Sequence, residues 1–212
     1  MHLPDGIVPL PLALAGYVGS GLIAWACLRR IERKPDPRRE LPRAAMLTAA
    51  FFIASLIYLP LPPVSVHLVL NGLLGAVLGW FAFPAILVGL LLQAVMFGHG
   101  GITTLGLNGL IFGLPALASY AVFVLGRKLS RSPRSDALFG FVAGALAVAA
   151  SALLFVLLLL WQMPAELDSA LEQQALQVFV IAHVPVMLLE GLVTATLVAL
   201  FVRIDPALLV RA

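Results

Sequence analysis

Long apolar runs separated by short polar loops constrain this chain more than any other feature. Hydrophobic residues make up 62% of its 212 residues and charged residues 11%, against roughly 45–50% and 25% in soluble domains. A helix needs about 20 apolar residues to cross a hydrocarbon layer of about 30 Å. The sequence therefore predicts an all-α integral membrane protein with seven transmembrane helices. These are expected at 9–30, 43–59, 64–81, 84–97, 106–127, 137–162 and 174–203.

The thirteen basic residues all fall on one side of this predicted arrangement. Seven lie in the first loop, 29–43, four surround the fifth loop, and two close the chain. Because short cytoplasmic loops retain Lys and Arg, we expect the amino terminus outside and the carboxyl terminus in the cytoplasm. The first loop is expected to be solvated and to contact partners or anionic lipid. The sequence pI of about 9.5 then reflects topology and not a nucleic-acid partner.

The amino-terminal segment, 1–8, carries an unusual set of nitrogen donors. The α-amine of Met1, the backbone nitrogen of His2 and its Nδ1 can bind one ion in two fused, nearly coplanar rings. Planar nitrogen coordination favours Ni(II) or Cu(II), whereas Zn(II) prefers a tetrahedron. The segment lacks the pattern of a cleaved signal peptide, and Met1 is expected to remain because His2 is too bulky to favour removal of the initiator. Alternatively, His2 is simply part of a frayed terminus. Asp5 either orients the His2 imidazole or closes a turn with Gly6.

A second histidine is expected within reach of this terminus. His67 is predicted about one turn into the helix over 64–81, and eight extended residues reach up to about 26 Å. His2 and His67 can therefore meet, which would fill the fourth corner of a planar site. Asn71 lies one turn deeper on the same predicted face. The alternative is a hydrogen-bonded core histidine, although ionisable residues within lipid are more often functional.

A glycine-rich loop, 98–105, follows a predicted helix that is too short to cross the membrane alone. Polar backbone at membrane depth survives only where protein or a watery cavity shelters it, so we expect a mobile outer lid. His99 is a transient ligand, a group behind the ligands, or an ordinary loop residue. Thr103 in the loop and Asn108 just after it are likewise candidates for the lid or for groups behind the ligands.

Small residues four apart line the predicted helix over 43–59. Ala45 and Ala49 form one ridge, and Ala50 and Ala54 form another. Such spacing lets helices approach closely within lipid. The ridges serve internal packing or the docking of an external helical partner.

Two polar residues stand two turns apart on the last predicted helix. A carboxylate at Glu190, within lipid, must be protonated or paired. We interpret it and His183 as groups for packing or coupling and not as ligands. The lone cysteine, Cys27, allows no intrachain disulfide and is expected to pack.

Several motifs together resemble one known family. They are the Met-His-Leu-Pro-Asp-Gly start, Ser65-Val66-His67-Leu68 and Gly98-His99-Gly100-Gly101-Ile102-Thr103-Thr104-Leu105-Gly106. Essentially the whole chain is similar to the substrate-capture (S) subunit of nickel/cobalt energy-coupling-factor (ECF) ABC transporters, the CbiM/NikM type.

The resemblance implies a single transmembrane domain over 1–212, with six S-subunit helices plus one at the amino terminus. It implies high-affinity capture of Ni(II) or Co(II) at the outer face of a prokaryotic cell membrane, with no organic cofactor. The ion ligands would come from Met1, His2 and His67. The alanine ridges would dock on a transmembrane coupling (T) subunit, alongside two ABC ATPases and a small companion membrane subunit.

The chain is expected to be a transporter subunit and not an enzyme. Its only lysines, Lys34 and Lys128, are outside any Gly-x-x-x-x-Gly-Lys-Ser/Thr loop, so ATP hydrolysis would come from separate subunits. Two alternatives remain at this point. One is an S subunit for an organic vitamin, which would need an aromatic-lined pocket. The other is an intramembrane hydrolase that pairs Ser20 with His183.

Overall fold

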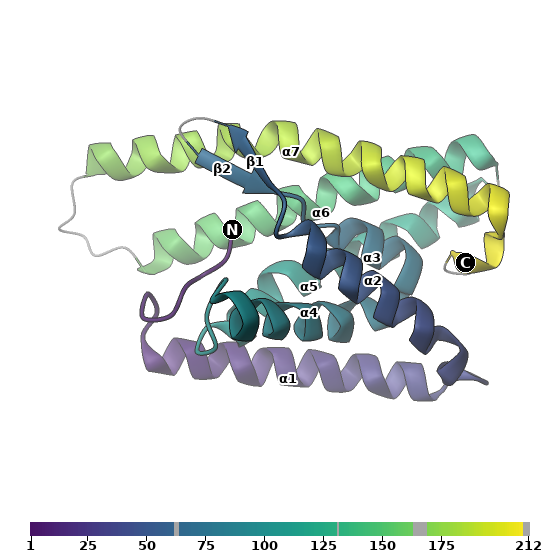
Figure 1. The fold of residues 1–212 in the computed structure, drawn as a ribbon, viewed down its shortest axis with the longest axis horizontal. Coiled ribbons are helices and arrows are strands. Elements are labelled where there is room, and N and C mark those ends of the chain that lie inside the picture. The colour runs from purple at the N-terminus through teal and green to yellow at the C-terminus, as the bar shows by residue number, and fades with distance from the viewer. Residues whose placement is uncertain (62–63, 131, 163–168, 210–212) are drawn as a thin grey trace.

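The computed structural model describes residues 1–61, 64–130, 132–162 and 169–209 as a bundle of helices with one small hairpin (Figure 1). The α-helices are α1 (Leu10–Glu32), α2 (Leu41–Ala54), α3 (Asn71–Leu78), α4 (Ala82–Phe97), α5 (Leu105–Leu129), α6 (Pro133–Gln162) and α7 (Ser169–Ile204). Short 3-10 helices cover Pro37–Glu40, Gly79–Phe81 and Pro206–Leu208. The strands β1 (Tyr58–Leu61) and β2 (Val64–His67) pair antiparallel.

Several helices carry the length and apolar surface of membrane spans. Five segments of the described chain are long and apolar enough to cross a bilayer: Leu10–Glu32, Asn71–Phe97, Leu105–Leu129, Pro133–Gln162 and Leu176–Ile204. On α1, Leu14, Val18, Leu22 and Trp25 are all more than half exposed. This continuous apolar stripe is compatible with lipid and unfavourable in water. The protein is therefore a multi-pass membrane protein, as its composition predicts.

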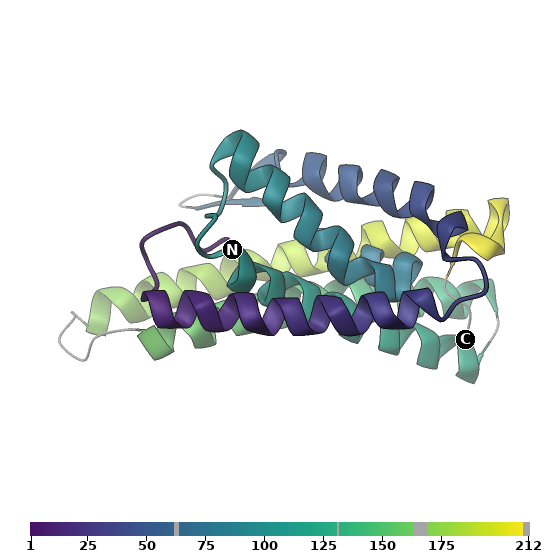
Figure 2. The ribbon, with the colours of Figure 1, turned by 90° about the horizontal axis from the view of Figure 1, so that it is seen from below.

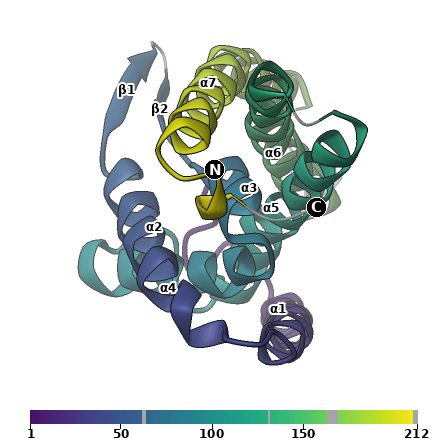
Figure 3. The same ribbon diagram turned by 90° about the vertical axis from the view of Figure 1, so that its right-hand side faces the viewer.

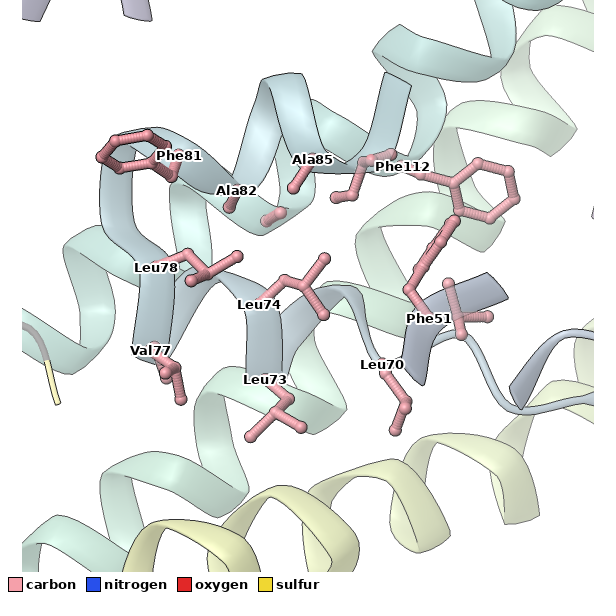
Figure 4. Packing of buried hydrophobic residues seen from close by; sticks show 14 of the residues in the cluster. Phe51, Leu70, Leu73, Leu74, Val77, Leu78, Phe81, Ala82, Ala85 and Phe112 are labelled. Atoms are coloured by element: carbon pink, nitrogen blue, oxygen red, sulfur yellow. The ribbon is translucent and has the colours of Figure 1, made fainter. Parts of the chain in front are cut away.

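The expectation of seven separate spans is not met by the helix lengths. At 1.5 Å per residue, α2 with 14 residues measures about 21 Å and α3 with 8 residues about 12 Å. The apolar segment Asn71–Phe97 is not a single helix, because Gly79 adopts φ +58° and separates α3 from α4. Figure 4 shows the chain turning back between Leu78 and Ala82, so that α3 and α4 form a helical hairpin.

The predicted helix over 64–81 is wrong in its first part. Residues 64–67 form strand β2 instead, with His67 opposite Tyr58. β-Branched residues at 64 and 66 favour a strand. Leu70 then takes the left-handed conformation, with φ +57°, and forces a break before α3 begins. His67 is thus the last residue of a strand. The sequence periodicity had implied a helix at this position.

The α3–α4 hairpin forms the centre of the bundle. Every residue of α3 is buried, and its leucines pack against Phe51 of α2, Ala85 of α4 and Phe112 of α5 (Figure 4). A Cβ on Gly75 would overlap the carbonyl oxygen of Ala116, so α3 and α5 touch backbone to backbone. Figure 3 shows α1 at the edge of the bundle, on the side away from α7.

The basic residues gather at one end of the bundle. Arg29 and Arg30 lie in the last turn of α1, Arg127 and Lys128 in that of α5, and Arg203 in that of α7. The helices α1 and α7 both end on the side where the carboxyl terminus lies (Figure 1). Because α1 extends to Glu32 and α2 starts at Leu41, the loop predicted over 29–43 is shorter than expected.

Candidate metal centre

The amino-terminal segment folds back from the start of α1 onto the bundle (Figure 2). Leu3 is buried, and its backbone N–H donates to Oδ1 of Asn108 at 2.9 Å. The Asn108 amide donates in return to the Leu3 carbonyl at 3.1 Å, and the Thr104 hydroxyl donates to the same oxygen at 2.6 Å. These bonds pair both backbone groups of the residue after His2. They hold the terminus inside the protein instead of leaving it frayed.

A second anchor joins this segment to the loop between α4 and α5. The Asp5 carboxylate accepts from the Thr103 N–H at 2.8 Å and from the Thr103 hydroxyl at 2.5 Å. The hydroxyl bond chiefly lowers the pKa of Asp5. Gly101 lies so close that any side chain there would overlap this carboxylate. Asp5 therefore binds the loop backbone, a role that neither sequence interpretation included, while Gly6 makes the turn with φ +83°.

Three imidazoles converge where the amino-terminal segment meets this loop, and one of them, His99, belongs to the loop. The ring centroids of His2 and His99 are 4.3 Å apart, those of His2 and His67 5.2 Å, and those of His67 and His99 5.3 Å. One ring nitrogen from each lies within 4.8 Å of the others. Both ring nitrogens of His2 are buried and make no protein hydrogen bond of normal geometry. Phe112 closes the floor, with its ring 4.8 Å from that of His2.

Burial keeps these nitrogen donors neutral. It lowers the pKa of the Met1 amine to about 6 and that of His67 to about 4. The pKa of His2 falls well below its usual value, first through burial and then through the neighbouring amine. Burial also lowers the pKa of His99. At neutral pH all four groups present lone pairs, which is the state that binds a metal ion.

The His67 strand is held from behind by α7. Glu190 is fully buried and accepts hydrogen bonds from the backbone N–H groups of Val69 and Leu70, the latter at 2.9 Å. These bonds fix the turn that carries His67 into the site. Glu190 thus has a structural partner, in keeping with its interpretation as a packing group.

Other polar residues surround the centre at different depths. Asn71 donates to Ser151 Oγ at 2.9 Å and to the Phe112 carbonyl at 3.2 Å, so it links α3 to α5 and α6. Gln93 of α4 is fully buried and lies next to His2. Sequence reasoning missed Gln93 and Thr104. A glutamine inside an apolar run, where burial is costly, was the available signal for the first.

His183, the remaining histidine, stays outside the three-histidine cluster. Its Nδ1 bonds to the Phe179 carbonyl at 2.6 Å, and the His183 and Phe179 rings lie with their centroids 4.0 Å apart and their planes tilted by 37°. Ser20, its partner in the hydrolase alternative, donates its hydroxyl to the Gly106 carbonyl at 2.6 Å. Each group is thus engaged within its own surroundings, which removes the observation that favoured a hydrolase.

The alanine ridges of α2 face in two directions. Ala45 and Ala49 are exposed and Ala50 is half-buried, whereas Ala54 is buried in the core. The proposed docking surface is corrected accordingly, because the Ala54 side chain is not available to an outside partner.

An amino terminus tied to three clustered histidines, of which His67 is buried and His2 and His99 are half-buried, can be compared with known proteins. Residues 2–208 match the CbiM family, described as a cobalt uptake substrate-specific transmembrane region. The chain belongs to the CbiM family. It is 33% identical over 214 residues to a Haemophilus influenzae protein named for metal transport, covering 100% of this chain and 98% of that one.

Two fused relatives extend this comparison. The fused nickel transport protein NikMN of Rhodobacter capsulatus is 33% identical over 132 residues, 60% of this chain and 38% of that protein. A fused CbiMQ protein of Methanocorpusculum labreanum, named for cobalt transport, is 31% identical over 221 residues, 99% of this chain and 36% of that protein. This CbiM-family chain thus spans little more than a third of each fused relative.

A crystal structure of a truncated transition metal transporter has the same fold. Its TM-score is 0.73 at 24% sequence identity, with 96% of this chain and 97% of that one covered. Family membership makes this chain a substrate-specific transmembrane component of cobalt and nickel uptake, in a prokaryotic membrane.

Proposed function

We propose that this chain captures Ni(II) or Co(II) with high affinity at the outer membrane face and delivers the ion to an ECF-type importer. The observation that carries the proposal is the burial of the Met1 amine together with His2 and His67. These residues supply the amine, the backbone and ring nitrogens of the second residue, and one further imidazole. Four nitrogen donors in a near-planar set suit Ni(II), and Co(II) also accepts nitrogen ligands.

The space between the histidines favours an ion over an organic substrate. Ring centroids 4.3 to 5.3 Å apart leave room for a single atom bound between nitrogens and not for a vitamin. Metal capture therefore accounts for the geometry better than the vitamin alternative.

The distribution of charges supports an outer position for the site. Basic residues lie at the end of the bundle where α1, α5 and α7 finish, and the positive-inside rule puts that end in the cytoplasm. The amino terminus and the loop over 98–105 then face outward. In this orientation the loop acts as a lid, because Gly100 lies directly against His2.

Delivery requires partners. The exposed Ala45 and Ala49 on α2 offer a flat surface on which a helix of a coupling (T) subunit can pack closely. Two separate ABC ATPases would supply the energy, and a small companion subunit completes the set. The fused CbiMQ relative, in which a matching segment is part of a longer chain, supports association with further membrane subunits.

The test is calorimetry on the purified chain, with Met1 verified by intact mass. Two added glycines before Met1 convert the amine to an amide and should weaken Ni(II) binding at least about 100-fold. Two are used because a single glycine would place the histidine third from a free amine, which is itself a planar nickel chelate. The matched control carries the same two glycines after the last residue and should bind as the native chain does. His67→Ala should also lose tight binding. Unchanged affinity in the glycine-first chain, with retained helicity, refutes the proposal.

A further inference from the structure

Three imidazoles meet where the proposed planar set uses only two. His99 lies nearer to His2 than His67 does, at 4.3 Å against 5.2 Å between ring centroids. One of its ring nitrogens also lies within 4.8 Å of a ring nitrogen of His2 and of one of His67. The planar set of Met1, His2 and His67 gives His99 no role.

We propose that His99 is a specificity-determining residue, which together with His2 and His67 forms a three-imidazole site for Zn(II). This inference rests on the proposed function, because the zinc and nickel sites share two histidines. Zinc bound in this way excludes nickel from the same pocket. The site thus has two coordination modes, one planar through the Met1 amine and one tetrahedral through His99.

The observed distances suit a tetrahedral ion. Three nitrogens within 4.8 Å of one another leave a point no more than about 2.8 Å from each of them. Zinc–imidazole bonds measure about 2.0–2.1 Å, so each ring needs to move by less than about 1 Å. Three protein ligands and one water molecule are a common zinc arrangement. The unbonded ring nitrogens of His2 are available for it.

The backbone around His99 can supply this movement. Gly98 and Gly100 flank it with φ +61° and +81°, a region that glycine samples freely. The His99 N–H donates to the Gln93 carbonyl at 3.1 Å, and the bonds from Thr103 to Asp5 hold the far end of the loop. The two ends of the loop are therefore fixed by hydrogen bonds, while the glycines on either side of His99 let its imidazole shift toward the ion.

The experiment measures Zn(II) and Ni(II) affinities separately by titration calorimetry on the full chain. His99→Ala should weaken Zn(II) binding at least about tenfold and Ni(II) binding less than about threefold. His99→Cys should restore Zn(II) binding to within about threefold, because a thiolate ligates zinc well. His183→Ala removes a histidine outside the cluster and should change neither affinity by more than about threefold.

The outcomes separate this inference from the proposed function. An unchanged Zn(II) affinity in His99→Ala, or an equal loss for both ions, overturns the role of His99. Failure of His99→Cys to restore zinc binding also overturns this role. A thiolate can replace an imidazole as a zinc ligand, but it cannot replace the ring as a packing group. The chain with two glycines before Met1 should keep Zn(II) binding while losing Ni(II). Unchanged Ni(II) binding there would overturn the planar site alone.

Discussion

The pair of hydrogen bonds between Asn108 and Leu3 makes a strong prediction about metal affinity. Asn108→Ala removes the only side chain that bonds to the Leu3 N–H in the described structure, at 2.9 Å in a buried position. The Leu3 carbonyl keeps the Thr104 hydroxyl at 2.6 Å. The substitution therefore orphans one buried backbone donor, and it does so only while the amino-terminal segment is docked.

An orphaned buried donor costs about 1–3 kcal/mol. When the segment leaves the bundle, water solvates the Leu3 N–H, so the whole cost falls on the docked state. Metal binding requires that state, and its apparent affinity falls with its population. Since about 1.4 kcal/mol corresponds to a factor of ten, Ni(II) affinity should fall by up to about 5- to 150-fold, the full factor applying where the unloaded segment is mostly undocked.

Titration calorimetry at constant pH measures this loss. Ser119→Ala is a matched control, because it removes a buried hydrogen bond from the same helix, to the Ala143 carbonyl at 2.8 Å. It leaves the amino-terminal segment untouched and should keep Ni(II) affinity within about twofold. Equal affinities for Asn108→Ala and Ser119→Ala would refute the idea that Asn108 positions the terminus.

Three further predictions follow from burial, close packing and the surface of α2. Ni(II) affinity should fall about tenfold per pH unit between about pH 8 and 6.5, because binding displaces the His2 backbone N–H proton, and more steeply below about pH 6, where the Met1 amine is also protonated; calorimetry across pH would contradict this if the steeper decline began near 8. Gly75→Ala should lower the free energy of unfolding by about 1–3 kcal/mol relative to Gly21→Ala, where a Cβ meets nothing; equal denaturation midpoints would disprove the contact. Ala49→Leu should block co-purification with the coupling subunit while Ni(II) affinity is kept, and intact assembly would exclude α2 as the docking surface.

The membrane class was predictable because it depends on local chemistry, and the donor role of Met1 and His2, which stays a prediction, rests on local chemistry as well. Apolar runs limit a chain to lipid or to a buried core whatever its tertiary contacts are. The donors of Met1 and His2 are adjacent in sequence, so their chelating arrangement needs no fold. The proximity of His67 followed from chain reach alone, even though the predicted helix around it was wrong.

The hairpin and the break before α3 were not predictable from apolar periodicity. A run that is buried on all sides shows no preferred face, so helix and strand cannot be told apart within it. The decisive contacts come from far along the chain. Glu190 accepts from the Leu70 N–H across 120 residues, and this bond stabilises the left-handed turn that aims His67.

The position of His99 also depended on tertiary structure. In the loop that carries His99, the backbone N–H groups of Ile102 and Thr103 donate to the Asp5 carboxylate. Asp5 precedes these two residues by 97 and 98 positions in the chain. No spacing rule connects these positions. The motif itself signalled a special loop, while its partner appeared only once the amino terminus had folded back.

X-ray absorption on the nickel-loaded full chain, combined with a density map of the site, tests the central claim most directly. The account predicts four nitrogen neighbours in a near-planar shell: the Met1 amine, two nitrogens of His2 and one of His67. A nickel ion bound by imidazoles alone, or found with a formylated Met1 lying outside its coordination shell, would contradict it.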